Sequence, residues 1–300
     1  MIVDVLQTLV DGLLIGMSYG LIALGFTLVF GVFKRINLAF GACLLLGAAL
    51  AIWLQSMLNY GVFGLVFVTI TGSALASIYV EKICFSPHIG PNAANASMIA
   101  SFAIWMQLDE ISTILLPQRT HAFAGIEFEG LEFAGLLFRI EHLTIALVAI
   151  LCVLLVSWLN SKSRLSQHIK AVKEDPNLAE ILGLPVSRIN ITVFALSGCI
   201  GGLGAFLILS ADGHVTPLFG IWTLFKGLAA VMIGGLGSIP GAMIGGIVLG
   251  LSETYAAYSF GAEFRDIVTF SLLFAVMIIR PSGLFGSAAL RTEQMAKARI

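Results

Sequence analysis

The sequence predicts an all-α integral membrane protein, a single polytopic bundle of 8–9 transmembrane helices within residues 1–300. Two observations predict this fold class. Apolar residues make up 58% of the chain and charged residues only 11%, whereas a soluble domain carries about 25% charged residues. Several charge-free runs also approach or exceed the roughly 20 residues that a helix needs to cross a bilayer. The N-terminus shows no basic segment followed by a cleavage site, so we expect the first apolar segment to remain as a helix.

Apolar runs place the membrane helices in order along the chain, and all of them are free of charged residues except 97–116, which contains Asp109 and Glu110. The predicted spans are 12–33, two within 36–80, 97–116, 143–159, 189–209, 227–252 and 267–279. A turn near Asn59 divides the long run at 36–80 into two helices. The glycine-rich stretch 234–241 interrupts the run at 227–252, which forms either one kinked helix or two shorter ones. One kinked helix gives eight membrane-spanning helices in total, and two shorter helices give nine.

Positive residues predict the orientation, because cytoplasmic loops are enriched in Lys and Arg. If the loop 161–188 is cytoplasmic and nine spans alternate, 12 of the 16 Lys and Arg lie on the inner side. The N-terminus is then periplasmic, 117–141 is a periplasmic loop and 287–300 is a cytoplasmic tail. Apolar and acidic residues alternate between Gly125 and Gly135, which is the period of a small β-hairpin. A solvated connector is the alternative for this loop.

The cytoplasmic loop contains the most informative segment, a short helix with a complete set of end signals. Asp175 is suited to cap its first turn, and Pro176 is suited to its first helical position. Gly183 can adopt the left-handed conformation that ends a helix, and Pro185 prevents its continuation. A helix of about two turns is marginal in water, so we expect a soluble partner to hold it. An idle solvated loop is the alternative.

Glycines at helical spacing form a second pattern. Repeats four residues apart occur at Gly12, Gly16 and Gly20, at Gly241 and Gly245, and at Gly246 and Gly250. Small residues at this spacing allow close packing of membrane helices. The break at 234–241 is tolerated in a membrane only where protein buries it or where it lines a cavity. Lys226 and Glu253 bracket this segment, and we expect both at its outer interface. Charges near the bilayer either reach water at a helix end or mark function, and we expect a functional role for Lys226 and Asp109 and contact with water for the others.

Several motifs are absent from the sequence. It contains no G-x-x-x-x-G-K-[ST] phosphate loop, no H-E-x-x-H and no G-x-S-x-G, so we expect neither ATP hydrolysis by that route nor catalysis on this chain. Four well-separated cysteines predict small buried apolar side chains rather than disulfides or a metal site. A net charge of −1 predicts no nucleic-acid surface.

The sequence resembles the permease subunits of the branched-chain (hydrophobic) amino acid ABC importers over nearly its whole length. The resembling segments are 16–31, 36–48, 171–183, 234–253 and 280–286. The most specific of them is Gly234-Gly-Leu-Gly-Ser-Ile-Pro-Gly241, followed by Gly245, Gly246 and Glu253. The resemblance implies a transport subunit of the bacterial inner membrane that works by alternating access.

The resemblance also implies partners and residue roles. A second homologous permease, two cytoplasmic ATPase subunits and a periplasmic substrate-binding protein complete such an importer within the membrane lipid. ATP and Mg belong to the ATPases, and this chain binds no cofactor. The residues expected to couple to the ATPases are Ala171, Glu174, Asp175, Ala179, Leu182 and Gly183. Those expected along the substrate pathway are Tyr19, Thr27, Asn37, Phe40, Gly41, Lys226, Gly235, Gly237 and Ser238.

One departure from the family pattern affects the expected solute. Family members commonly carry histidine where this chain has Phe40, and a polar or acidic residue where it has Ala42. A more apolar segment offers less help to a zwitterion, so urea, amides or organic acids are alternatives to branched-chain amino acids. An ion-coupled carrier or channel is the rival from another class and predicts flux without ATP. A membrane scaffold that moves nothing is a third, weaker interpretation.

Overall fold

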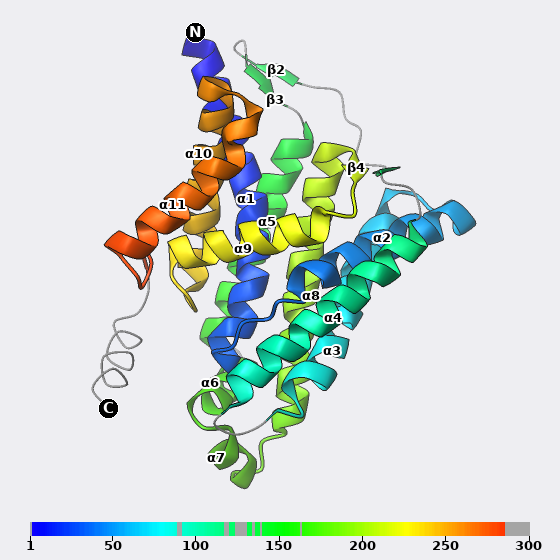
Figure 1. The fold of residues 1–300 in the computed structure, drawn as a ribbon, viewed down its shortest axis with the longest axis vertical. Helices are drawn as coiled ribbons and strands as arrows, with labels where there is room; N and C mark the ends of the chain where they lie inside the picture. Colours follow the sequence, from blue (N-terminus) through cyan, green and yellow to red (C-terminus); the bar gives the residue numbers. More distant parts are fainter. Residues whose placement is uncertain are drawn as a thin grey trace.

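The computed structural model describes residues 2–88, 92–116, 120–123, 131–133, 136–138, 140–162 and 164–285. Nearly all of them are helical (Figure 1). The helices are α1 Ile2–Phe33, α2 Phe40–Leu58, α3 Val62–Val80, α4 Ala93–Leu115, α5 Ile140–Lys162, α6 Arg164–Glu174, α7 Pro176–Ile181, α8 Val186–Asp212, α9 Phe219–Gly234, α10 Ile239–Phe260 and α11 Arg265–Ile279. A π-helical turn, Glu81–Phe85, extends α3, and a 3₁₀ turn, Ala262–Phe264, precedes α11.

Each predicted span coincides with a helix. Five described helices, α1, α2, α3 with its π-helical turn, α4 and α8, are long and apolar enough to cross a membrane. The predicted turn near Asn59 is confirmed, because this residue adopts a left-handed conformation with φ 49° between α2 and α3. The predicted break at 234–241 is also confirmed, since α9 and α10 meet there at a bend of 116°. The fold is therefore an all-α bundle with several apolar helices.

Two short antiparallel strand pairs lie at the end of the bundle opposite α7 (Figure 1). β2 (Leu131–Phe133) pairs with β3 (Leu136–Phe138), so hairpin pairing occurs at the far end of the stretch predicted to hold one. Residues 125–130 and 134–135 of that stretch lie outside the described residues. β1 (His121–Ala122) pairs with β4 (His214–Val215) and ties the loop to the end of α8. The predicted tail 287–300 also lies outside the described residues.

Glycines allow α1 to pack closely against α10, and α3 to pack closely against α8. A Cβ atom at Gly16 would lie 2.7 Å from the Cα atom of Ile247, so the two backbones touch. A Cβ atom at Gly198 would lie 2.6 Å from the carbonyl oxygen of Ser73. The predicted packing role of the Gly12–Gly20 and Gly246–Gly250 repeats is therefore confirmed, as expected where association depends on close backbone approach.

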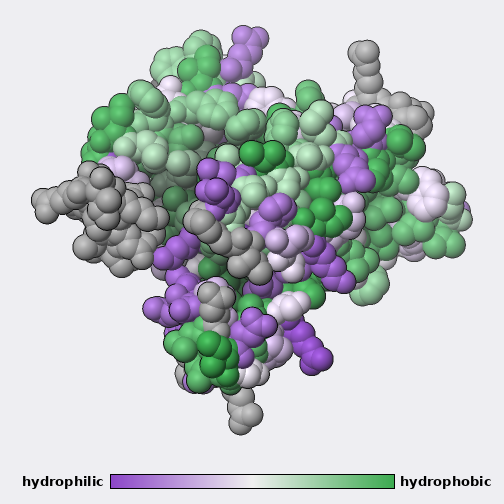
Figure 2. All heavy atoms as spheres, turned by 60° about the horizontal axis from the view of Figure 1, so that its bottom comes forward, coloured by the Kyte–Doolittle hydropathy of each residue, from purple (hydrophilic) through white to green (hydrophobic). Residues whose placement is uncertain are grey.

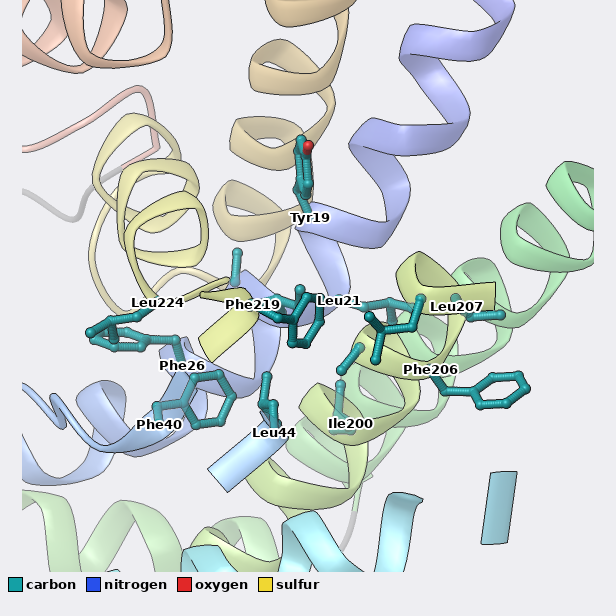
Figure 3. Packing of buried hydrophobic residues seen from close by; sticks show 14 of the residues in the cluster. Tyr19, Leu21, Phe26, Phe40, Leu44, Ile200, Phe206, Leu207, Phe219 and Leu224 are labelled. Atoms are coloured by element: carbon teal, nitrogen blue, oxygen red, sulfur yellow. The ribbon is translucent and has the colours of Figure 1, made fainter. Parts of the chain in front are cut away.

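The apolar core surrounds the middle of α1 (Figure 3). Phe26 of α1 packs edge-to-face on Phe40 of α2, with ring centroids 5.8 Å apart, and both side chains are buried. Large apolar side chains also remain exposed on the flanks, including Phe63, which is 93% exposed, and Ile99, which is 67% exposed. Figure 2 shows extensive apolar atoms over these flanks. A bundle that is apolar both inside and outside suits lipid as its surroundings.

Candidate functional site

The projecting helix α7 has the end signals that the sequence predicts. The Asp175 carboxylate accepts a hydrogen bond from the backbone N–H of Leu178 at 3.1 Å. Gly183 has a φ of 81°, in the left-handed region. The N–H of Leu184 reaches back to the carbonyl of Ala179 at 3.0 Å, which closes the helix end. The cap residues therefore shape this turn locally, as the spacing of Asp175 and Gly183 indicated.

The two faces of α7 differ in exposure. Ala179 is buried against Val172 of α6 and Ile189 of α8, and this small apolar cluster attaches α7 to the rest of the bundle. By contrast, Leu178 is 54% exposed and Ile181 81%, and Leu182, in the turn directly after α7, is 70% exposed. In Figure 2, where this end comes forward, polar side chains gather around it and an apolar patch remains on it. A short segment that exposes three large apolar side chains, two on α7 and one directly after it, is suited to a protein partner.

The predicted coupling residues divide between these faces. Glu174, Asp175, Leu182 and Gly183 are exposed, Ala171 is half-buried, and Ala179 lies in the small cluster beneath. The sequence analysis missed two of the three exposed apolar residues, Leu178 and Ile181. Their separation of three residues, which places side chains on one helix face, was the signal that could have identified them.

Four polar side chains from four helices meet in a buried cluster. The Lys226 Nζ atom of α9 lies 2.9 Å from Glu253 Oε2 of α10. The Tyr19 hydroxyl of α1 donates to the same carboxylate oxygen at 3.0 Å and accepts from Lys226 Nζ at 2.9 Å. Thr269 of α11 donates to the other carboxylate oxygen. A buried ion pair of this kind is stable only when hydrogen bonds satisfy both partners, and Tyr19 and Thr269 supply them.

The placement of Glu253 corrects one sequence prediction. We expected this carboxylate at the outer interface, in contact with water. Instead it is 2% exposed and lies inside the bundle. The bend between α9 and α10 turns the chain back, so Lys226 and Glu253 face each other across the fold although 27 residues separate them. Spacing along the sequence does not encode such a contact.

A polar cavity of about 290 Å³ opens beside this cluster, and we call it the outer cavity. Its lining includes both Tyr19 and Lys226, so the structure brings these two predicted pathway residues together. Asp212 at the end of α8 and Arg265 and Asp266 at the start of α11 add further charges. The rest of the wall is formed by Ile22, Ile208, Thr216, Phe219, Trp222, Thr223 and Ala262.

A second cavity of about 350 Å³, which we call the inner cavity, lies between α1, α5, α6 and α8. Thr27 and Gly237, two more predicted pathway residues, line it. Its walls are mostly apolar, and α6 contributes Lys170 and Lys173. The thiols of Cys152 and Cys199 belong to the same wall. All four cysteines are free; Cys43 and Cys84 are buried, as predicted, whereas Cys152 and Cys199 are only half-buried.

The other predicted pathway residues lie outside both cavities. Asn37 is 2% exposed and accepts a hydrogen bond from the N–H of Ala39 at 3.0 Å. Phe40 belongs to the apolar core, and Gly41 packs against the backbone of Gly220. These three residues support the start of α2 in this structure.

At the break itself, two residues have packing or capping contacts. Gly235 packs against Gly283, since a Cβ at Gly283 would lie 2.6 Å from the Gly235 nitrogen. The Ser238 hydroxyl accepts from the N–H of Gly241 at 3.1 Å and caps α10. Among the residues that the structure describes, no group of three or more His, Cys, Asp or Glu is placed to hold a metal ion.

Comparisons with known proteins add to this geometry. Residues 8–277 match the family model described as the permease component of branched-chain amino acid transport systems. The chain is 29% identical over 299 residues to the high-affinity branched-chain amino acid transport system permease protein BraD of Pseudomonas aeruginosa, covering 94% of this chain and 95% of that protein. It is 26% identical to the corresponding protein LivH of Escherichia coli K12, with the same coverage of both chains.

A solved ABC transporter shares the fold. The structure of an inward-facing metal-chelate type ABC transporter superposes with a TM-score of 0.52 and 17% identity, and the match covers 92% of this chain and 85% of that one. At this identity the likeness concerns the arrangement of helices alone.

Proposed function

We propose, because this chain belongs to the family of permease components of branched-chain amino acid transport systems, that it carries hydrophobic amino acids, or a related small solute, into the cell by alternating access. The protein is a multi-pass transport subunit of the inner membrane rather than an enzyme, as its relatives are. Its action requires partners that supply energy and substrate. These are a second homologous permease, two cytoplasmic ATPases that hold ATP and Mg, and a periplasmic binding protein.

The single observation that carries this proposal is the capped helix α7 with its exposed apolar side chains. Leu178, Ile181 and Leu182 present a small apolar surface at one end of the bundle. The buried Ala179 and the cap at Asp175 hold that surface rigidly to α6 and α8. We assign α7 as the coupling helix that docks on an ATPase subunit. Closure of the ATPases would then move α6 and α8 with it, and both of these helices line the inner cavity.

The orientation follows from this assignment. If α7 is cytoplasmic, the strand pairs and the N-terminus at the opposite end of Figure 1 are periplasmic. Counting α9 and α10 as separate crossings gives nine spans and a cytoplasmic C-terminus. The segment 117–141 is then the periplasmic loop, 161–188 the cytoplasmic coupling loop and 287–300 a cytoplasmic tail of a single permease domain, 1–300.

The two cavities provide a route along α1. Tyr19 lines the outer cavity and Thr27 the inner one, and eight residues of helix correspond to about 12 Å along the axis. Between them, Ile22 and Phe26 are buried in the core. We propose that solute passes from the outer to the inner cavity when the helices around these apolar side chains move. Gly237, at the bend, lies in the wall of the inner cavity.

The departure at Phe40 does not oppose an amino acid as the solute. Phe40 is 1% exposed and packs on Phe26, outside both cavities. The polar groups available to a zwitterion lie instead around the outer cavity. An ion-coupled carrier remains the rival from another class, and it predicts solute flux without ATP and without soluble partners.

The coupling role is tested by replacing Gly183 with valine. A β-branched side chain at a φ of 81° is strained by about 1–2 kcal/mol, and it would distort the end of α7 without entering the membrane. We expect the Gly183→Val protein to insert normally and to lose most ATPase co-purification and ATP-driven uptake. The matched control is Gly61→Val, because Gly61 is also a loop glycine with no atom near its Cβ position, but with a φ of −73°.

The measurement is purification of the tagged chain from its native membranes in mild detergent, followed by identification of its partners. Two ATPase subunits and a second permease are expected with the parent chain and with Gly61→Val. Normal partner yield and normal uptake in Gly183→Val would contradict the role of α7. A parent chain that arrives alone and moves solute without ATP would overturn the importer in favour of the carrier.

A further inference from the structure

We propose that the outer cavity is a recognition site within the permease itself, which binds both the carboxylate and the ammonium group of a zwitterionic amino acid. The proposal rests on the proposed function for the direction and energy of transport. It adds that the membrane subunit, and not only a binding protein, selects the solute. Three features of the cavity support it: its balanced charges, an available lysine donor and an apolar wall.

Charges of both signs line the cavity. Lys226 and Arg265 provide cationic groups, while Asp212 and Asp266 provide carboxylates. Asp212 lines this one small cavity together with Lys226 and Arg265, so charges of opposite sign face the same space and can act on one small ligand. An organic acid requires only the cations, and urea or a neutral amide requires neither sign. Two carboxylates in the same cavity therefore favour a ligand that also carries an ammonium group.

Lys226 is held so that one of its donors is available to the cavity. Its Nζ atom donates to the Tyr19 hydroxyl and to the Glu253 carboxylate, at 2.9 Å each. An ammonium group has three donors, and 18% of the Lys226 side chain is exposed, in the wall of the outer cavity. The buried partners fix the direction of the side chain, so the third N–H is positioned for a ligand carboxylate. Such charge-assisted bonds are among the stronger hydrogen bonds.

The remaining wall is mostly apolar, with Thr216 and Thr223 as its polar members, and suits a hydrophobic side chain. Ile22 and Phe219 are buried, while Trp222 presents a large ring that is 41% exposed. A volume of about 290 Å³ lies at the lower end of the range for ligand pockets, roughly 300–1,000 Å³. The cavity therefore fits a ligand of the size of a single amino acid, with its charged end toward Lys226 and Arg265.

The experiment measures equilibrium binding of tritiated L-leucine to the purified complex in nanodiscs, without its binding protein. The variants are Asp212→Asn and Arg265→Gln, because both residues are exposed at helix ends, where substitution is expected to disturb the fold least. Each removes one charge that faces the ligand, so each is expected to weaken leucine binding about tenfold or more. The matched control is Glu263→Gln, an exposed acid in the 3₁₀ turn directly before Arg265 that does not line the cavity. It is expected to bind leucine as the parent complex does.

Competition by two analogues assigns the charges. 4-Methylpentanoate lacks the ammonium group and 3-methylbutylamine lacks the carboxylate, so each is expected to compete at least tenfold more weakly than unlabelled leucine. Equal competition by 4-methylpentanoate would overturn the zwitterion in favour of an organic acid. Absence of saturable leucine binding to the parent complex, or unchanged binding in both charge variants, would also overturn the proposal.

A parallel uptake assay separates this inference from the proposed function. The same complex, with its binding protein restored, is tested for ATP-driven leucine uptake in proteoliposomes. If the parent complex takes up leucine and the cavity variants bind leucine as the parent does, the recognition site is refuted but the importer is not. Leucine binding without ATP-driven uptake refutes the importer while supporting the site.

Discussion

The outer and inner cavities share one helix but differ in chemistry. α1 contributes Tyr19 to the outer cavity and Thr27 to the inner one. The outer cavity has charges of both signs and rests on a buried ion pair, whereas the inner cavity is larger and mostly apolar, with two lysines from α6. We propose that the outer cavity holds a polar ligand in a fixed orientation and that the inner cavity releases it, because the mostly apolar inner wall offers few groups that bind.

The two regions also differ in how their walls are supported. Four helices meet at the Tyr19–Lys226–Glu253–Thr269 cluster, so the outer cavity depends on hydrogen bonds between side chains. Beside the inner cavity, Gly31 has ample space, because a Cβ there would meet only Gly237, at 3.9 Å. Polar contacts between helices therefore hold the wall of the outer cavity, whereas the wall of the inner cavity is less crowded at Gly31.

The largest effect is expected from breaking the outer ion pair. Lys226→Met leaves the Glu253 carboxylate buried without its counter-charge, which costs about 3 kcal/mol or more. We expect a lower thermal unfolding midpoint in detergent and reduced yield of folded protein. The double variant Lys226→Met with Glu253→Met should recover most of the stability, since apolar replacement of a whole buried pair is often neutral. An unchanged midpoint in the single variant would show that the cluster does not support this region.

A smaller effect is expected from adding one methyl group on α1, and its size depends on which neighbours face that position. A Cβ at Gly16 would lie 2.7 Å from the Ile247 Cα, so Gly16→Ala forces α1 and α10 apart and costs about 1–3 kcal/mol. Gly31→Ala is the matched control on the same helix and should be neutral, because its nearest neighbour is 3.9 Å away. Thermal unfolding of the two variants measures the difference. Equal unfolding midpoints for Gly16→Ala and Gly31→Ala would contradict the inferred difference between the close contact of α1 with α10 and the less crowded inner cavity.

Much of the fold could be predicted from the sequence, because a short stretch of residues is enough to recognise both an apolar segment long enough to cross a bilayer and the residues that cap a helix. Apolar runs gave the positions of the helices, and the Asp175 and Gly183 end signals gave α7. The position of the glycine break was predicted from the sequence, but the 116° bend there and its effect on the fold were not. Only the folded chain brings Glu253 to Lys226, so the acid expected in contact with water proved to be buried.

The candidate site was predicted less completely than the fold, for a related reason. Tyr19, Lys226, Thr27 and Gly237 line cavities, whereas Phe40, Gly41 and Ser238 pack or cap. Residue type does not separate these roles, because the sequence does not distinguish a glycine that packs at a bend from a glycine that lines a cavity. The charges of Asp212 and Arg265 were missed since they belong to helix ends, where ionised side chains are common.

The central claim is that the two cavities are the ends of one path and open alternately. Its most direct test is thiol labelling of the complex, with and without non-hydrolysable ATP, with mass spectrometry to locate the label. Cys199 reports on the inner cavity, and Thr216→Cys reports on the outer one. The buried Cys43 and Cys84 serve as internal controls that should stay unlabelled. We predict that ATP changes labelling at the two cavity positions in opposite directions, whereas changes in the same direction, or none, would contradict alternating access.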